Sequence, residues 1–263
     1  MAENQKILQR SQRSKFNMKK SEYTKLFCIA HREYAGLPDN EIVTPVLVGM
    51  NEANIDLKIR DYYPNLSVNN LNWNELEAIY YIWKNVHAPA KGQFQYSCRL
   101  PLSEIEILGL LSRYKFIVHM QYIENLKKQF IKYHGDWFLP VIKESVKEIS
   151  PEITEEVFEK AENSPVLLSR NCFIAAEDDY NELCEWLFKV IFLFNDKMGF
   201  KTVDDIKAYL KTKGIPDELL TYQSRVSGFI SERLLTLYII WKFDDLSKVV
   251  SPKYEYFKKT GLG

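Results

Sequence analysis

Two short apolar runs, Thr24-Lys-Leu-Phe-Cys-Ile-Ala30 and Val43-Thr-Pro-Val-Leu-Val48, decide how this chain folds. Each is continuous rather than alternating, which is typical of strands buried on both faces of a parallel sheet. The first run stops at His31 and the second stops at Gly49. Because ligands bind beyond the carboxyl ends of strands in open α/β sheets, we expect His31 and Gly49 to lie beside a site.

The remaining elements follow from hydrophobic period. Apolar runs predict two further strands at 115–119 and 166–174, and apolar residues at helical spacing predict four helices. These helices cover 73–86 with Asn72 as cap, 180–194, a stretch that begins in a capping box at Thr202 and ends at Gly214, and 226–241 around Gly228. Strands come early and helices dominate the C-terminal half, so the sequence predicts an α/β fold with a helical C-terminal portion.

Composition limits the class of protein. The chain has 263 residues, with 35 Lys and Arg balancing 35 Asp and Glu, and this lack of basic excess disfavours nucleic-acid binding. Its four cysteines are widely spaced, which indicates reduced thiols rather than a zinc site or disulfides. The longest apolar run, Ala78 to Trp83, is far below the roughly 20 residues of a membrane span, and no signal peptide is evident. We therefore expect a cytoplasmic protein.

The charge is unevenly distributed. Within residues 1–20, six basic side chains stand against Glu3, which gives a local charge of +5 and leaves −5 for the rest. We predict a basic arm at 1–22 and a single domain at 23–263. The arm favours peripheral contact with an anionic membrane at the inner face, although a solvated terminus explains it equally simply.

The usual catalytic signatures are absent from the sequence. There is no GxGxxG, GxxxxGK[ST], HExxH or GxSxG motif, and the histidines have no ligand spacing. No Asp-x-Asp pair is present to hold a divalent cation on a diphosphate, so we predict no metal site, while a divalent metal stays open as a cofactor.

Three polar segments are candidates for chemistry. Asn72–Glu77 places amide, indole and carboxylate groups at an expected helix N-terminus, where a diphosphate or sugar could bind, or where the helix is simply capped. The segment 92–99 is predicted as a loop from which Arg99 could pair with phosphate. Gly228 interrupts a strong helix, which indicates close approach by another group, and Arg233 in its apolar stripe must be paired.

Several blocks in order and spacing carry a resemblance. They are Pro45-Val-Leu-Val-Gly49, Asn72-Trp-Asn-Glu75-Leu-Glu-Ala78-Ile-Tyr80-Tyr-Ile-Trp83-Lys-Asn85, Asn171-Cys-Phe-Ile174, Tyr180-Asn-Glu-Leu-Cys184-Glu-Trp186-Leu-Phe188 and Gly228-Phe-Ile-Ser-Glu232-Arg233-Leu234. Through them the chain resembles, over nearly all of residues 24–245, a bacterial capsular and exopolysaccharide glycosyltransferase family first catalogued as a domain of unknown function.

The resemblance implies a GT-A-like, Rossmann-related nucleotide-sugar domain. Its expected activity is transfer of a sugar, of hexosyl or galactofuranosyl type, from a nucleotide sugar to a bacterial polysaccharide. UDP is the expected nucleotide, and the expected acceptor is a lipid-linked capsular, exopolysaccharide or O-antigen oligosaccharide. Such chemistry needs a carboxylate base and stabilisation of the leaving diphosphate.

Site residues follow from the resemblance and from the residue types together. We predict catalytic roles for Glu75 and Glu232. The predicted donor-binding residues are His31, Gly49, Asn74, Tyr96, Arg99 and Arg233, and the predicted sugar or acceptor wall is Trp73, Tyr80, Trp83 and Asn171.

One block departs from the family pattern. Members usually carry His-Tyr-Arg-Arg in a central loop, where this chain has Gln95-Tyr96-Ser97-Cys98 and then Arg99. The alternative is therefore a non-catalytic scaffold or interaction protein in a polysaccharide assembly complex. A third interpretation, an interaction module built on the C-terminal helices, requires an exposed apolar patch.

Overall fold

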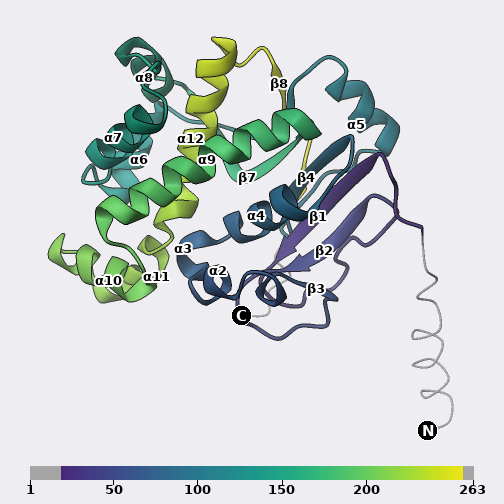
Figure 1. Ribbon diagram of the computed structural model, residues 1–263, viewed down its shortest axis with the longest axis horizontal. Coiled ribbons are helices and arrows are strands. Elements are labelled where there is room, and N and C mark those ends of the chain that lie inside the picture. The colour runs from purple at the N-terminus through teal and green to yellow at the C-terminus, as the bar shows by residue number, and fades with distance from the viewer. Residues whose placement is uncertain (1–18, 257–263) are drawn as a thin grey trace, which may run out of the picture.

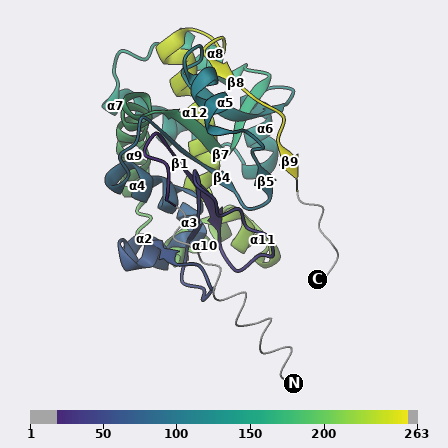
Figure 2. The same cartoon turned by 90° about the vertical axis from the view of Figure 1, so that its right-hand side faces the viewer.

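A seven-stranded sheet runs through the computed structural model, which describes residues 19–256 (Figure 1). The strand order is β3-β2-β1-β4-β7-β6-β8, and all neighbours are parallel except the two pairs that involve β7. A separate two-stranded antiparallel sheet, β5 with β9, lies beside it (Figure 2). The strands are β1 Thr24–Ala30, β2 Val43–Leu47, β3 Leu57–Lys58, β4 Ala90–Gln95, β5 Cys98–Arg99, β6 Phe116–Tyr122, β7 Val166–Ala176, β8 Val249–Val250 and β9 Glu255–Tyr256.

Helices dominate the chain after β6, as the sequence predicts. In Figure 1 most of them gather on one side, whereas α5 lies apart from them. The helices are α2 Pro64–Val68, α3 Asn70–Trp73, α4 Leu76–Asn85, α5 Glu104–Leu111, α6 Leu126–His134, α7 Leu139–Ile149, α8 Glu155–Glu162, α9 Glu177–Met198, α10 Val203–Thr212, α11 Asp217–Gln223 and α12 Val226–Phe243, with a 3-10 turn at Ile59–Asp61. The prediction of an α/β fold with a helical C-terminal portion is confirmed.

Both faces of the sheet are covered. Along β1, Phe27 and Ile29 point into the larger core, which α4, α9 and α12 share, while Leu26 and Cys28 point into a smaller core under α5. Strands buried on both sides explain why the runs of β1 and β2 are continuously apolar. The predicted strands at 24–30, 43–48, 115–119 and 166–174 correspond to β1, β2, β6 and β7.

The predicted loop at 92–99 is wrong, because its first half is strand β4, between β1 and β7 in the sheet. The run Ala-Lys-Gly-Gln-Phe-Gln has few strand-forming residues, so local propensity does not identify it. Tertiary contacts satisfy its polar groups instead. Lys91 donates to the Val86 carbonyl at 2.7 Å, and the Tyr180 hydroxyl donates to Gln93 at 2.8 Å. At Gly92, an added Cβ would lie 2.4 Å from the Phe173 carbonyl oxygen.

The helix predicted from Trp73 with Asn72 as cap is also wrong at its start. Asn74 has φ 49° and ψ −122°, which separates α3 from α4, and α4 begins at Leu76. Asn72 is buried instead, and its amide bonds Asn195 at 3.0 Å and the Ser227 backbone N–H at 2.9 Å. Because these long-range partners compete for the Asn72 side chain, it does not cap a helix.

The other predicted helices are confirmed as α9, α10 and α12. Thr202 and Asp205 form the capping box of α10, and Gly214, with φ 75°, follows its end. The close approach predicted at Gly228 is present, since a Cβ there would lie 2.9 Å from the Asn74 amide nitrogen.

Most of the predicted basic arm lies outside the described residues. Within them, Lys20 donates to Asp39 and to the Asn40 carbonyl, both at 2.6 Å. Between residues 19 and 256, no helix is both long enough and apolar enough to cross a bilayer.

Candidate active site

A bulge in β7 forms the floor of the candidate site. The register with β6 shifts so that His119 faces the segment 169–172. Within this bulge Arg170 and Asn171 have φ values of 65° and 50°, in the left-handed region, which Asn tolerates but which is unfavourable for Arg. Strained backbone of this sort is concentrated at functional sites, where it aims groups that a regular strand would not.

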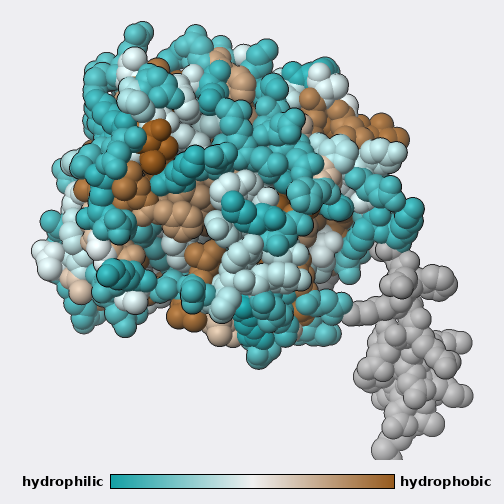
Figure 3. Space-filling model, viewed as in Figure 1, coloured by the Kyte–Doolittle hydropathy of each residue, from teal (hydrophilic) through white to brown (hydrophobic). Residues whose placement is uncertain are grey.

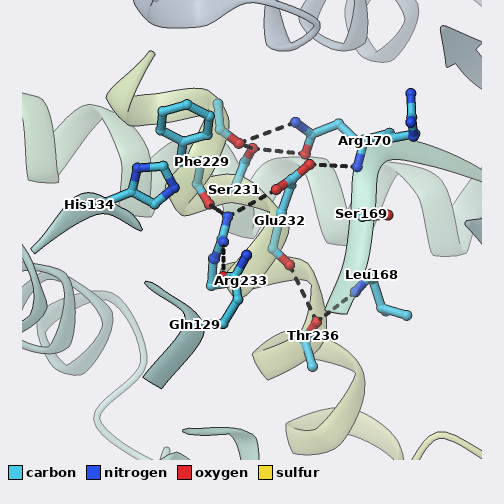
Figure 4. A network of polar contacts seen from close by, with 12 residues as sticks. Gln129, His134, Leu168, Ser169, Arg170, Phe229, Ser231, Glu232, Arg233 and Thr236 are labelled. Atoms are coloured by element: carbon cyan, nitrogen blue, oxygen red, sulfur yellow. Dashed lines mark hydrogen bonds and ion pairs between the residues drawn. The ribbon is translucent and has the colours of Figure 1, made fainter. Parts of the chain in front are cut away.

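Glu232 of α12 is fixed over this bulge by two partners (Figure 4). Its carboxylate accepts from the Arg170 backbone N–H at 2.5 Å and pairs with the Arg233 guanidinium at 2.9 Å. Burial raises the pKa of Glu232, and the Arg233 charge opposes that rise. The side chain remains 17% exposed, so its charge is held in place at the edge of solvent.

The Arg233 guanidinium is enclosed by protein groups. It donates to the Phe229 carbonyl at 2.7 Å and to Gln129 (Figure 4). It also lies 5.2 Å from the centroid of the Phe130 ring. The sequence prediction that this arginine is paired is confirmed by its contact with Glu232. With these partners, Arg233 is placed to hold Glu232 rather than to meet a phosphate.

Glu75, the second predicted carboxylate, enters from the turn between α3 and α4. It is half-buried, and its Oε1 accepts from the Gln95 amide at 2.6 Å. Burial raises the pKa of Glu75 to about 7, and the nearby Glu232 carboxylate adds to the rise, while Arg225 opposes it. A carboxylate with a pKa near neutrality can accept and release a proton at physiological pH.

Asn171 and Asn74 join the two carboxylates to α12. The Asn171 amide donates to the Gly228 carbonyl at 3.3 Å and accepts from the Ser231 hydroxyl at 2.8 Å. Its side chain also bonds Glu75 and opposes the rise in the pKa of that carboxyl. Asn74 packs against Gly228. The structure therefore brings together four of the predicted residues with Arg233, namely Glu75, Glu232, Asn74 and Asn171.

A second cluster lies where β1 and β4 end. The rings of Tyr34 and Tyr96 stack with centroids 3.8 Å apart, and His31 stands edge-on to both. Burial lowers the pKa of His31, and the positive charges of Arg32 and Arg225 lower it further. The charge of Arg225 lowers the pKa of His31 and opposes the rise at Glu75, so it acts on both clusters.

Arg99 belongs to the edge of this second cluster. Its guanidinium donates to the Gly36 carbonyl at 2.6 Å, across the turn that follows β1. Gly49, predicted to lie beside a site, comes two residues after the end of β2 and donates its N–H to both oxygens of Glu77, at 3.2 and 3.1 Å.

The predicted aromatic wall lies elsewhere. The Trp83 ring stacks on Phe188 of α9, Tyr80 meets the same ring edge-on, and Trp73 packs against Phe192. These three side chains are thus placed in the contact of α3 and α4 with α9, and the structure does not bring them to the carboxylates.

Two arginines were missed as candidates for the site. Arg170 donates to Gln95 at 3.4 Å and to the Ser97 hydroxyl at 3.2 Å, and Arg225 precedes the first turn of α12. Arg170 sits in an expected strand, so no local signal identifies it. Arg225 does carry a local sequence signal, because it stands at the start of a long predicted helix, where backbone N–H groups favour anions.

The C-terminal strand covers the outer side of the bulge. The Tyr256 hydroxyl bonds His119, whose other ring nitrogen bonds the Ser169 hydroxyl at 2.7 Å. The Arg170 guanidinium lies 5.5 Å from the Tyr256 ring centroid. Burial, followed by the charge of Arg170, lowers the pKa of His119 to about 4, so this histidine is neutral near pH 7.

Among the described residues, no group of three or more His, Cys, Asp or Glu side chains could hold a metal ion. The two carboxylates of the site already have protein partners, Gln95 for Glu75 and Arg233 for Glu232.

Comparison with known proteins points to one family and one fold. A family model described as a domain of unknown function (DUF4422) matches residues 25–242. The solved apo structure of WbbM, a bifunctional glycosyltransferase, is similar with a TM-score of 0.70 at 20% identity. The match covers 89% of this chain and 45% of the WbbM chain, so this chain spans less than half of that protein. No curated protein matches the chain. The likeness confirms the predicted GT-A-like α/β fold.

Proposed function

The chain belongs to the DUF4422 family, and from this premise we propose that it is a glycosyltransferase acting at the Glu75–Glu232 site. The observation that carries the proposal is the position of Glu75, a carboxylate with a pKa of about 7 at the carboxyl edge of the sheet. In an open α/β sheet this edge is where substrates bind.

The proposed chemistry uses the residues around Glu75 and Glu232, together with Arg225 at the start of α12. Glu75 accepts the proton of an acceptor hydroxyl. The oxygen of that hydroxyl bonds the anomeric carbon of the donor sugar, and the bond from this carbon to the diphosphate breaks. We assign Arg225 and Arg170 as the cations for the leaving diphosphate, with the first turn of α12 following Arg225. Glu232, fixed by Arg233, orients this arrangement.

The finer parts of the proposal rest on the family resemblance. We propose a UDP sugar of hexosyl or galactofuranosyl type as donor, and a lipid-linked bacterial polysaccharide precursor as acceptor. Peripheral contact with an anionic membrane through residues 1–20 would bring the protein to such an acceptor. A divalent cation would then bind with the donor diphosphate rather than in a site built by the protein alone.

Two experiments test the activity. Thermal-shift measurements with UDP, GDP and their sugars should show stabilisation by at least one nucleotide. Incubation with the stabilising sugar nucleotide and an oligosaccharide mixture, with and without EDTA, should release nucleoside diphosphate in wild type and not in Glu75→Gln. Absence of both stabilisation and release would sink the proposal.

The altered Gln95-Tyr96-Ser97-Cys98 segment favours a second candidate, a non-catalytic scaffold. Gln95 occupies both Glu75 and Arg170 through hydrogen bonds, so the segment is committed to internal contacts. The two candidates differ in one outcome. A scaffold binds nucleotide without turnover, and Glu75→Gln leaves its behaviour unchanged.

A further inference from the structure

A groove between the 59–66 segment, α4 and α9 has no role in the proposed reaction. Its volume is about 210 Å³, and its walls include Tyr62, Tyr63, Asn65, Tyr80 and Phe192. The outermost aromatic residues are accessible, with Tyr62 52% and Phe192 40% exposed. In Figure 3 the front of the molecule carries white to brown side chains where Figure 1 places α3, α4 and α9.

The groove is aromatic and carries no charge. None of the side chains that line it is acidic or basic. The Tyr80 ring stands nearly perpendicular to that of Tyr63, at 5.0 Å, and to that of Phe192, at 6.1 Å. The rings therefore form walls at an angle to one another rather than one closed stack.

Polar atoms are distributed among these rings. The Tyr63 hydroxyl accepts a hydrogen bond from the Asn85 amide at 2.9 Å and keeps its own proton to donate. In the part of the chain that the structure describes, the Asn65 amide has no hydrogen-bond partner. An amide and phenolic hydroxyls can both donate and accept, which suits a ligand that also does both.

We propose that this groove binds a neutral saccharide unit of the acceptor, an inference that rests on the proposed transferase function. A sugar ring has an apolar C–H face that packs on aromatic rings, and hydroxyls at its rim that pair with amides and phenols. A nucleotide or an anionic lipid would find no positive charge among the lining side chains.

Neither Glu75 nor Glu232 lines the groove. Tyr80 comes five residues after Glu75, about 140° further round α4 at 3.6 residues per turn. A saccharide bound there would be a sugar of the acceptor chain remote from the one that receives the transferred group.

The test measures saccharide binding without any donor, so that it does not depend on transfer. Lactose, maltotriose and a galacto-oligosaccharide are titrated into the Glu75→Gln protein, and binding is followed by saturation-transfer NMR. We expect binding of at least one of the three, and an affinity at least tenfold weaker when Tyr62→Ala or Phe192→Ala is added. Tyr122→Ala, which removes a ring that is 81% exposed outside the groove, is the matched control and should leave affinity unchanged.

The outcomes separate the two proposals. No binding of any of the three saccharides, or equal binding by the Tyr62 and Phe192 variants, overturns the groove assignment even where wild type transfers sugar. Groove-dependent binding in a protein that shows no turnover overturns the transferase proposal instead. Self-association that Tyr62→Ala abolishes, with no saccharide binding, would identify a second copy of this chain as the occupant.

Discussion

Glu75 and Glu77 are separated by one residue, yet they have opposite surroundings. Glu77 is 0% exposed and accepts hydrogen bonds from the Gly49 backbone N–H, the Asn70 amide at 2.7 Å and the Ser67 hydroxyl. Glu75 is half-buried, bonds the side chains of Gln95 and Asn171, and faces the like charge of Glu232. Burial raises the pKa of both carboxyls, and at Glu77 the three donors oppose it.

The difference teaches how to separate a structural carboxylate from a reactive one. Glu77 joins the segment after β2, helix α2 and the start of α3, so its hydrogen bonds contribute to the stability of the fold. Glu75 is held where its protonation state can change, so we expect it to take part in proton transfer. The turn at Asn74 fixes where the two side chains diverge.

The largest expected effect is on transfer by Glu75→Gln. Loss of the proton acceptor should lower kcat by about a hundredfold to ten-thousandfold, while nucleotide binding stays near wild type. Nucleoside diphosphate release at saturating donor measures it. A Glu75→Gln protein with wild-type kcat would assign the base elsewhere, and Glu232→Gln is then the next variant to measure.

Glu77→Ala should act on stability. Removing the carboxylate leaves the Gly49 N–H without a partner, and it leaves the Asn70 amide and the Ser67 hydroxyl with only their longer bonds to backbone carbonyls. The free energy of unfolding should therefore fall by about 3 kcal/mol. Urea unfolding measures this loss, and Ser67→Ala, which removes one donor, should give about 1 kcal/mol. The folded Glu77→Ala fraction should keep kcat within about tenfold of wild type. If Glu77→Ala left stability unchanged and abolished activity, Glu77 rather than Glu75 would be the reactive carboxylate.

Gly228→Ala should disturb Glu75 indirectly. The new Cβ would displace the Asn74 amide, shift the turn that carries Glu75, and lower kcat by about tenfold. Gly109→Ala is the matched control, because Gly109 also lies in a helix but has no atom within 4 Å of an added Cβ. That control should stabilise the protein by about 0.5–1 kcal/mol and leave kcat unchanged. Equal kcat in the two variants would show that the position of Asn74 does not affect the reaction at Glu75.

The last expected effect is a pH dependence of stability. Because the pKa of Glu75 is raised to about 7, the folded protein keeps a proton that the unfolded chain releases near 4.5. Stability from this group is therefore present at low pH and lost as the pH rises to about 7. The Tm of Glu75→Gln should match wild type near pH 4.5 and exceed it at pH 8. A constant Tm difference across this range would contradict the raised pKa.

Much of the fold could be predicted because its signals are local. Continuous apolar runs identify β1 and β2, and Thr202 with Asp205 identifies the start of α10. β4 could not be predicted, since Lys91 and Gln93 have partners distant in sequence, Glu177 at 3.6 Å for Lys91 and Tyr180 for Gln93. Asn74 likewise breaks a helical pattern that continues on both sides of it.

The candidate site was predicted in part for the same reason. Glu75, Glu232 and Asn171 stand in recognisable blocks, and the structure places them together. Arg170 gave no signal, because a bulge depends on the register of two strands rather than on either sequence alone. Glu77 did carry a sequence signal, because an acidic residue among buried helix positions indicates a buried, hydrogen-bonded carboxylate.

The pairing of β5 with β9 has a consequence for the order in which the fold and the site assemble during translation. Cys98 pairs with Tyr256 and Arg99 with Glu255, so this part of the site wall joins residues made early to residues made late. On the ribosome, β1 to β4 can assemble while α12 is still being translated. The bulge at Arg170 stays uncovered until residue 256 has emerged, so a nascent chain can form its first strands long before it can complete the site.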